Sequence, residues 1–163
     1  MTRKQAFEPV VDANTRLLIL GSLPGDASLR AAQYYAHPRN AFWRLIGGVI
    51  GRELAALPYD GRLAALKAAG VGLWDVIASA ERPGSLDAAI RRPEAADLRR
   101  LAASLPELRA VAFNGGAAAR LGRAVLAGVR DVELIDLPSS SPAHARPFER
   151  KAEAWAVLAR ALG

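Results

Sequence analysis

The sequence contains no cysteine, two histidines and three lysines among its 163 residues. Without cysteine there can be no disulfide, no iron–sulfur cluster and no thiol nucleophile. The two histidines, His37 and His144, lie far apart in the chain, which argues against a zinc site. We therefore expect a protein that works with no metal and no cofactor.

Long hydrophobic runs are also absent, although hydrophobic residues make up 52% of the chain. No uninterrupted apolar segment approaches the roughly 18 residues that a membrane span requires. The opening MTRKQAFEPV lacks the apolar core of a signal peptide. We expect a soluble, cytoplasmic protein with no membrane partner. Because one domain usually takes about 100 to 200 residues, residues 1–163 are expected to form a single domain, and we expect a monomer.

Acidic residues are the scarcer of the two charged classes. Lysine and arginine number 22 against 16 acidic residues, which gives a net charge of +6. With three lysines, 22 − 3 = 19 of the cations are arginines. Such an excess suits a partner rich in phosphate. A high-GC genome would raise the arginine content in the same way, and because the arginines are scattered, composition does not separate the two explanations.

Hydrophobic periodicity predicts strands that alternate with helices. The expected strands are 16–21, 71–77, 110–113 and 132–137, and the expected helices are 41–50, 61–69, 94–105, 117–126 and 147–162. Pro93 is placed in the first turn of the third helix, where proline is accepted, and residues 83–92 are expected to form a polar connection. Such alternation gives right-handed crossovers between parallel strands. The sequence therefore predicts an α/β sandwich, with helices on both faces of a parallel sheet of about four strands.

Parallel sheets bind ligands beyond the carboxyl ends of their strands. The segments that follow the expected strands are GSLPG at 21–25, Trp74 with Asp75, NGG at 114–116 and PSSSPAHA at 138–145. The unusual residues of the chain are thus expected to meet at one edge of the sheet. The phosphate-binding patterns GxxxxGK[ST] and GxGxxG are absent, so an ATP or dinucleotide site has little support.

Each candidate residue at this edge also has an ordinary structural explanation. The GSLPG glycines let backbone N–H groups approach a ligand, or they form a simple turn. Tyr35 can present a flat face to a planar ligand, whereas Tyr34 is expected to cover the sheet. Asn40 and Asn114 either cap the helices that follow them or use their amides on a ligand.

The loop PSSSPAHA at 138–145, the two histidines and Asp75 likewise allow either a structural or a functional role. The serines of PSSSPAHA can grip a phosphodiester or can form a solvated loop. His37 and His144 either belong to the surface or support a phosphate or a leaving group. Asp75 is a base, a cap for the following turn or a partner for an arginine.

Four motifs occur in order between Leu17 and about His144: GSLPG, YYAHPRNAFW at 34–43, FNGGAA at 113–118 and LPSSSPAHA at 137–145. Together they resemble the uracil-DNA glycosylase superfamily, most closely its hypoxanthine-DNA (deoxyinosine) glycosylase branch. The resemblance implies a three-layer α/β/α sandwich with a central four-stranded parallel sheet, in agreement with the order of elements.

The resemblance also implies roles for particular positions. Leu23 stands where mismatch-specific relatives keep a catalytic asparagine, and Asn40 becomes the catalytic amide. Tyr35 would stack on the flipped base, Asn114 would read its edge, and the serine loop would press on the DNA backbone. The implied base-binding residues are Gly21, Ser22, Leu23, Pro24, Gly25, Tyr35 and Asn114, and the implied DNA-binding residues are Ser139, Ser140, Ser141, Pro142 and His144.

The function implied by this resemblance is repair of DNA that contains deaminated bases. The enzyme would extrude the base and break its N-glycosidic bond with a water molecule aligned by Asn40. Backbone N–H groups of 21–25, and less directly His144, would meet the leaving base. A lyase step would need an amine nucleophile. Because the three lysines, Lys4, Lys67 and Lys151, lie outside the matching motifs, we expect a monofunctional enzyme.

Three alternatives remain open from the sequence. One is a glycosylase specific for uracil or for mismatches, since one asparagine can satisfy more than one keto base. Another is an enzyme or sensor of free nucleotides, and the third is a non-catalytic binder of lesion DNA. The sequence leaves the preference among hypoxanthine, uracil and xanthine undecided.

Overall fold

The centre of the fold is a parallel sheet of four strands. A computed structural model describes residues 3–82 and 84–163 of the chain. The strands are β2 (Leu17–Gly21), β3 (Val71–Asp75), β6 (Ala110–Asn114) and β7 (Glu133–Leu137). They lie in the order β3-β2-β6-β7, and each neighbouring pair is parallel. The predicted α/β class and the four-stranded parallel sheet are confirmed.

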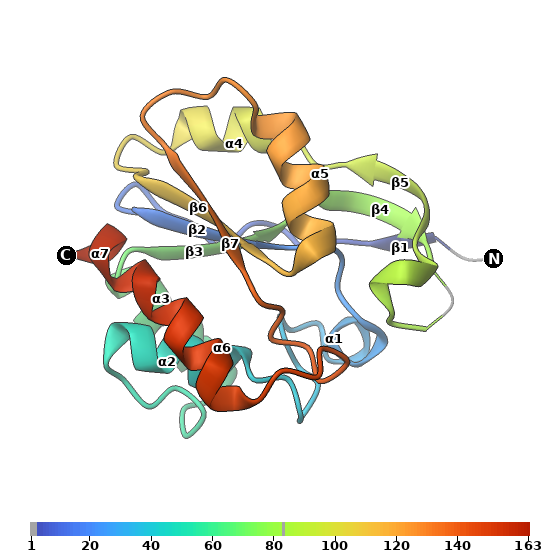
Figure 1. The fold of residues 1–163 in the computed structure, drawn as a ribbon, viewed down its shortest axis with the longest axis horizontal. Coiled ribbons are helices and arrows are strands. Elements are labelled where there is room, and N and C mark those ends of the chain that lie inside the picture. The colour runs from blue at the N-terminus through green and yellow to red at the C-terminus, as the bar shows by residue number, and fades with distance from the viewer. Residues whose placement is uncertain (1–2, 83) are drawn as a thin grey trace.

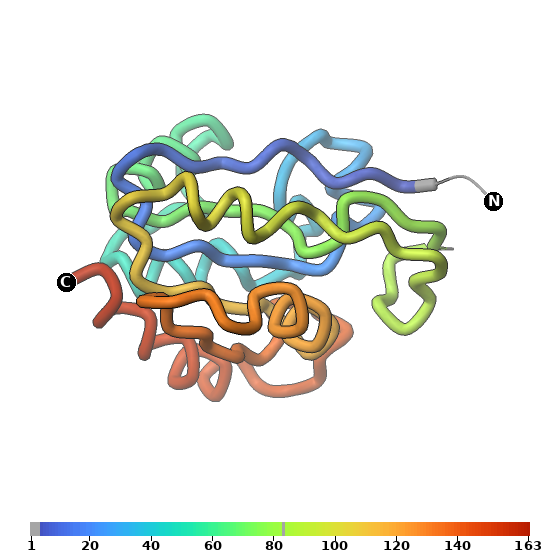
Figure 2. Tube along the Cα trace, turned by 90° about the horizontal axis from the view of Figure 1, so that it is seen from above, coloured from blue at the N-terminus to red at the C-terminus, as the bar shows by residue number. Residues whose placement is uncertain are grey.

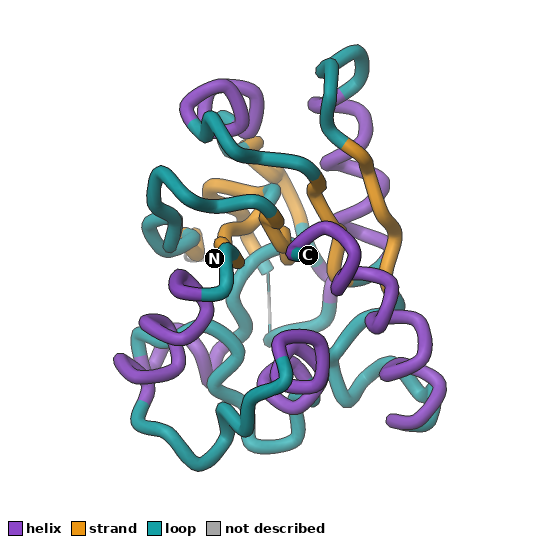
Figure 3. The backbone as a smooth tube through the Cα atoms, turned by 90° about the vertical axis from the view of Figure 1, so that its left-hand side faces the viewer, coloured by secondary structure: helices purple, strands orange, loops and turns teal. Residues whose placement is uncertain are grey.

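Helices cover both faces of this sheet (Figure 1). One face carries α4 (Leu98–Ser104) and α5 (Gly116–Leu126), and the other carries α2 (Phe42–Ile50), α3 (Tyr59–Ala68), α6 (Phe148–Trp155) and α7 (Ala159–Leu162). A short helix, α1 (Asp26–Ala31), follows β2. Figure 3 shows the strands as a middle layer with helices above and below. The architecture is the predicted three-layer α/β/α sandwich.

Strand β2 explains why the sheet is buried on both sides. Leu17 and Ile19 pack into the cluster that contains Phe42 and Trp155, whereas Leu18 and Leu20 pack into the opposite cluster with Phe113. Because side chains alternate between the faces of a strand, a continuous apolar run is what a strand covered on both faces requires. The run that marked this segment in the sequence therefore reflects burial between two helical layers.

A second sheet was not predicted. Its three antiparallel strands, in the order β1-β4-β5, are β1 (Arg3–Gln5), β4 (Ile77–Glu81) and β5 (Arg91–Ala95). The single strand expected at 71–77 is in fact two, since β3 ends at Asp75 and β4 belongs to the other sheet. The second sheet packs against α4 and α5 through Ile77 and Ala80 of β4, and β1 lies at the opposite end of the molecule from α7 (Figure 2).

The prediction of a helix over 94–105 was wrong in its first half. Residues 91–95 form β5, and α4 begins only at Leu98, after Asp97 accepts a hydrogen bond from the backbone N–H of Arg100. Pro93 lies in this edge strand, where a missing backbone N–H costs nothing. Of the expected polar connection 83–92, residues 87–89 form a 3-10 turn, η1 (Asp87–Ala89), and Pro83 lies outside the described residues.

Smaller differences concern helix ends. The residue before α2 is Ala41 rather than Asn40, and the residue before α5 is Gly115 rather than Asn114. The expected helix 147–162 is interrupted by a 3-10 turn, η2 (Ala156–Leu158), between α6 and α7. In the described part of the chain no helix is long and apolar enough to span a membrane, and no three side chains among His, Cys, Asp and Glu gather as they would around a metal ion.

Candidate functional site

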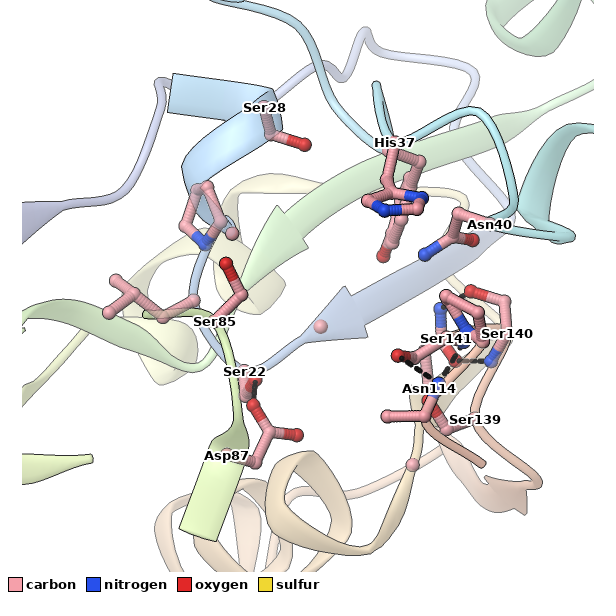
Figure 4. A pocket seen from close by; sticks show the side chains of 18 of the residues that line it. Ser22, Ser28, His37, Asn40, Ser85, Asp87, Asn114, Ser139, Ser140 and Ser141 are labelled. Atoms are coloured by element: carbon pink, nitrogen blue, oxygen red, sulfur yellow. Dashed lines mark hydrogen bonds between the residues drawn. The ribbon is translucent and has the colours of Figure 1, made fainter. Parts of the chain in front are cut away.

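A cavity of about 600 Å³ lies at the carboxyl ends of β2, β3 and β6. Segments from four parts of the chain enclose it, and Figure 4 shows His37 and Asn40 on one side, Ser22 and Asp87 opposite them, and Asn114 with the serines of the last loop below. Its lining includes every site residue named from the sequence: Gly21, Ser22, Leu23, Pro24, Gly25, Tyr35, Asn40, Asn114, Ser139, Ser140, Ser141, Pro142 and His144. The predicted convergence on one edge is therefore present.

The GSLPG loop turns its carbonyl groups away from the cavity. The Gly21 and Ser22 carbonyls accept the backbone N–H groups of Val76 and Ile77, at 2.8 and 3.1 Å. The Gly25 carbonyl accepts the N–H of Leu29. For the backbone N–H groups of residues 22, 23 and 25, no acceptor is found within the described residues. The loop thus offers several N–H donors along the cavity wall, as a site for developing negative charge requires.

Arg82 holds the remaining two carbonyls of this loop. Its Nη2 donates to the carbonyl oxygens of Leu23, at 3.4 Å, and Pro24, at 2.5 Å, and its Nη1 lies 3.4 Å from Asp87 Oδ1. The Arg82 side chain is 1% exposed, and burial lowers its pKa, an effect that Asp87, Asp26 and Asp75 oppose. A buried cation therefore fixes the shape of the loop and places positive charge behind it.

We expect Arg82→Met to destabilise the protein by about 2 to 4 kcal/mol, because two buried carbonyls lose their donor. Urea denaturation measures the change. The matched control is Arg160→Met, since Arg160 pairs with Glu133 at an exposed position and such pairs are worth about 1 kcal/mol or less. Equal losses in the two variants would show that Arg82 does not hold the loop.

Asn40 lies in the turn that leads into α2. Its Oδ1 accepts the backbone N–H of Phe42 at 2.9 Å, and its own backbone N–H donates to the His37 carbonyl. Because the oxygen faces the helix, the amide nitrogen is the end turned toward the cavity (Figure 4). The capping and ligand-binding explanations of Asn40 are therefore compatible: one end of the amide supports α2 while the other remains free.

His37 lies beside Asn40 in the same wall. Its Nδ1 accepts the backbone N–H of Arg39 at 3.1 Å, which leaves Nε2 to carry the ring proton. The histidine thus orders the turn that presents Asn40, and its Nε2 is left as a donor at the cavity.

Tyr34 and Tyr35 have different surroundings. Tyr34 is buried against Phe7, and its hydroxyl donates to the Glu8 carbonyl, so it covers the sheet. Tyr35 stacks on Phe42, with ring centroids 3.9 Å apart, which leaves at most one ring face for a ligand. Burial raises the pKa of Tyr35, and the nearby Asp75 raises it further while Asn114 lowers it. The Tyr35 hydroxyl has no hydrogen-bond partner within the described residues.

Two hydrogen bonds join Asn114 and Ser140. The Asn114 amide donates to Ser140 Oγ at 2.9 Å and accepts the Ser140 backbone N–H at 2.8 Å, while the Ser140 carbonyl accepts the N–H of Ala41. Ser140 is 1% exposed, which favours a role in positioning this loop against α2. One N–H and one lone pair of the Asn114 amide remain for a ligand.

The rest of the last loop is held by its own turns. Ser139 Oγ accepts the N–H of Ser141, and Ser141 Oγ accepts the N–H of Ala143, so each hydroxyl proton is still free to donate. At Gly115, φ is +102° and a Cβ atom would lie 3.1 Å from Ser139 Cβ. A side chain there would be strained and would crowd Ser139, so the glycine allows the two loops to approach.

A smaller hollow of about 260 Å³ adjoins the cavity through Ser140, Pro142 and His144. Four cationic side chains line it: Arg39, Arg44, Arg146 and Lys151. Burial lowers the pKa of His144, and so do the neighbouring charges of Lys151 and Arg146, so His144 is neutral at pH 7. The positive charge at this end of the site therefore comes from the arginines and from Lys151.

Asp75 lies on the cavity floor at the end of β3, opposite Gly21 in the parallel register. The residue is 4% exposed, and its Oδ2 has no hydrogen-bond partner within the described residues. Burial raises the pKa of Asp75 to about 7, since the opposing charge of Arg82 compensates only in part and Asp87 raises the pKa further. Of the three interpretations that the sequence allowed, a direct ion pair with an arginine is not observed among the described residues.

One wall of the cavity was missed by the sequence analysis. Ser85, Leu86 and Asp87 line it from the segment between β4 and β5. Ser22 Oγ donates to Asp87 Oδ1 at 2.5 Å, and the backbone N–H of Asp26 donates to Ser85 Oγ. No local signal marked this segment, because the antiparallel pairing of β4 with β5 places it.

Comparison with known proteins gives a consistent result. The model of the Uracil DNA glycosylase superfamily matches residues 8–160. A protein named hypoxanthine DNA glycosylase, from Methanosarcina barkeri (strain Fusaro / DSM 804), is 42% identical over 154 residues, which cover 94% of this chain and 96% of the relative. A protein of the same name from Methanosarcina acetivorans is 41% identical over 157 residues, which cover 96% and 98%. The solution NMR structure of a candidate uracil DNA glycosylase from Methanosarcina acetivorans has a TM-score of 0.88 at 41% identity and covers 99% of each chain.

Proposed function

The chain belongs to the uracil DNA glycosylase superfamily and is a DNA N-glycosylase, and from this premise we propose that it excises hypoxanthine from DNA by hydrolysis and leaves the abasic strand intact. The observation that carries the proposal is the single cavity of about 600 Å³ that gathers the residues of all four motifs. The names of the two Methanosarcina relatives support hypoxanthine as the base.

Base flipping is part of this proposal because the cavity is a pocket rather than a groove that could hold a duplex. A base inside the helix must leave the stack to reach Asn40, and a deaminated base is cheaper to unpair than a correct one. Tyr35 lines the cavity and is stacked on Phe42 on one side, so the base would stack on its other ring face. Asn114 keeps one N–H and one lone pair for the base edge.

Cleavage of the N-glycosidic bond leaves negative charge on the base and cationic character on the sugar. The N–H donors of the GSLPG loop, with Arg82 behind them, would stabilise the leaving base. A neutral amide is too weak a base to remove a proton from water. Asn40 would instead position the attacking water, through its free N–H and through the second lone pair of the oxygen that supports Phe42.

The DNA backbone would lie along the last loop. The hydroxyl protons of Ser139 and Ser141 can donate to a phosphodiester without adding charge. The adjoining hollow, with Arg39, Arg44, Arg146 and Lys151, supplies the positive charge for a neighbouring phosphate.

The monofunctional outcome follows from where the amines lie. Lys4 Nζ donates to Asp26 and to the Gly84 carbonyl, and Lys151 Nζ donates to the Ser141 carbonyl at 3.1 Å. None of the three lysines is among the residues that line the main cavity. Among the residues that the structure describes, no amine is therefore in place to form a Schiff base with the abasic sugar.

An excision assay tests this proposal. We expect purified protein to release free hypoxanthine from a duplex that contains deoxyinosine, and the labelled strand to break only after treatment with alkali. The same assay on uracil and xanthine duplexes measures base preference. Release of none of the three bases would contradict base excision. Breakage of the strand without alkali would contradict a monofunctional enzyme.

Salt dependence separates a DNA enzyme from an enzyme of free nucleotides. Binding to the duplex should weaken steeply between about 50 and 200 mM salt, since each phosphate contact releases counterions. Turnover of free deoxyinosine that is insensitive to salt would favour the nucleotide alternative.

A further inference from the structure

The cavity floor contains an acceptor that the proposed mechanism does not use. Asp75 is the last residue of β3, lines the cavity, and has no hydrogen-bond donor within reach of Oδ2 in the described part of the chain. Buried carboxylates are nearly always paired or hydrogen-bonded, because an isolated one is costly. An unpaired carboxylate at the bottom of a binding cavity is therefore explained if it accepts a hydrogen bond from a donor on the ligand.

The surroundings keep this carboxylate unpaired. The charge of Arg82 acts on Asp75, but the Nη atoms of Arg82 are engaged by the Leu23 and Pro24 carbonyls and by Asp87. Gly21 stands beside Asp75 in the sheet, and a Cβ at this position would lie 2.7 Å from Asp75 Oδ1 and 3.0 Å from the Tyr35 hydroxyl. The missing side chain of Gly21 thus leaves room for the polar groups of the floor.

Deamination changes one edge of a base in a way that suits an acceptor. Adenine and cytosine each carry a bare ring nitrogen next to an amino group, whereas their deamination products, hypoxanthine and uracil, carry a ring N–H next to a carbonyl. A carboxylate has only acceptor atoms. It would bond the ring N–H of a deaminated base and would repel the lone pair of the parent base.

We propose that Asp75 is a specificity-determining residue that accepts the ring N–H which adenine or cytosine gains on deamination, and so distinguishes hypoxanthine from adenine and uracil from cytosine. This inference rests on the proposed function, since it requires a base in the cavity. Asp75 is the last residue of β3, whereas Asn40 lies in the turn before α2, so recognition of the base edge and positioning of water are assigned to residues of different elements.

The charges around Asp75 make this recognition dependent on pH. The charged and titratable groups that face it are Arg82 after β4, Asp87 in η1, and Tyr34 and Tyr35 before α2. Since the pKa of Asp75 is raised to about 7, a growing fraction is protonated as the pH falls below 7. The protonated carboxyl is a donor and can bond the bare nitrogen of adenine. Discrimination against adenine should therefore decline in acid.

Binding of three duplexes tests the inference. They carry a 2′-fluoroarabino sugar, which resists cleavage, with hypoxanthine, adenine or unsubstituted purine, which lacks both the N–H and the carbonyl. We expect the wild-type protein at pH 8 to bind the hypoxanthine duplex about 10- to 100-fold more tightly than the other two. Asp75→Leu should reduce this preference to within a factor of about three. Asp75→Asn keeps an acceptor and gains a donor that can bond the bare ring nitrogen of adenine or purine, so it should also lose most of the discrimination against both.

The possible results separate a failure of the proposed function from a failure of the role proposed for Asp75. If wild-type protein releases no base from any cleavable duplex, the proposed function fails. If it releases hypoxanthine but Asp75→Leu keeps the wild-type preference, only the role of Asp75 fails. The rate of base release can also be measured on cleavable duplexes with hypoxanthine or purine. If Asp75→Leu and Asp75→Asn lower this rate equally for both bases, Asp75 acts in the catalytic step instead of in recognition. Because the pH dependence of discrimination is measured on wild-type protein, the inference is testable even if Asp75→Leu does not fold.

Discussion

Substitution of Asn40 by alanine is expected to lower the rate of base excision by about 100-fold or more, the scale of loss when one preorganised polar group is removed from an active site. The fold should survive. The Asn40 oxygen supports the N–H of Phe42 at the start of α2, and the loss of such a contact costs about 1 kcal/mol. Single-turnover excision of deoxyinosine gives the rate, and thermal denaturation gives the stability.

The matched variant is Asn40→Asp. It keeps an oxygen for the Phe42 N–H and places negative charge near the start of a helix, where charge of that sign is favourable. It removes the N–H that faces the cavity (Figure 4). We expect stability close to that of the wild type and excision nearly as slow as in Asn40→Ala. Excision at the wild-type rate in either variant would leave Asn40 with a capping role alone.

The second large effect concerns stability and pH. Asp75 has a pKa of about 7 in the folded protein against an ordinary value of 3.8. Well below pH 3.8 the group is protonated in both the folded and unfolded states and has no effect on stability. As the pH rises from 4 to 7, the unfolded chain releases the proton first, and the folded state loses stability. Since one pKa unit corresponds to about 1.4 kcal/mol, the loss is on the order of 4 kcal/mol.

Asp75→Asn removes this titration. We expect the variant to gain stability relative to the wild type as the pH rises from 4 to 7, with the full difference present at pH 8. Urea denaturation at pH 5 and pH 8 measures it, and Asp136→Asn, at an exposed position paired with Arg123, is the control. Parallel stability curves for the wild type and Asp75→Asn would contradict an unpaired buried carboxylate. A natural sequence that keeps a group at such a cost is typical of functional sites.

The main sheet and its binding edge could be predicted because burial on both faces leaves an obvious trace in the sequence. Leu17 to Leu20 and Ala110 to Phe113 are continuous apolar runs, and parallel strands must end at the same edge. Once these ends were placed, the residues that follow them had to share one region. All of the sequence-predicted site residues therefore line one cavity, although their individual roles remain proposals.

The second sheet could not be predicted from local patterns. Strand β5 has the sequence RRPEA and is exposed at all five positions, so it carries no hydrophobic signal. It forms because β4 offers a pairing edge. The wall that contains Ser85 and Asp87 depends on this pairing, and so it was missed along with the strands.

The status of Asp75 was likewise beyond the sequence. The spacing of Asp75 and Arg82 does not show that the arginine turns toward the carbonyls of a distant loop. Nor does it show that Gly21 leaves the carboxylate open. Such details depend on packing between segments that meet only in the folded protein, and they decide which polar groups remain free for a ligand.

The most direct test of the central claim is a crystal structure of the protein bound to a duplex that carries a non-cleavable 2′-fluoroarabino deoxyinosine. We predict that hypoxanthine lies outside the helix, in the cavity, with its sugar beside the Asn40 amide and its ring N–H toward Asp75. A base that remains stacked in the duplex, or that occupies another surface while the cavity holds only solvent, would contradict the account.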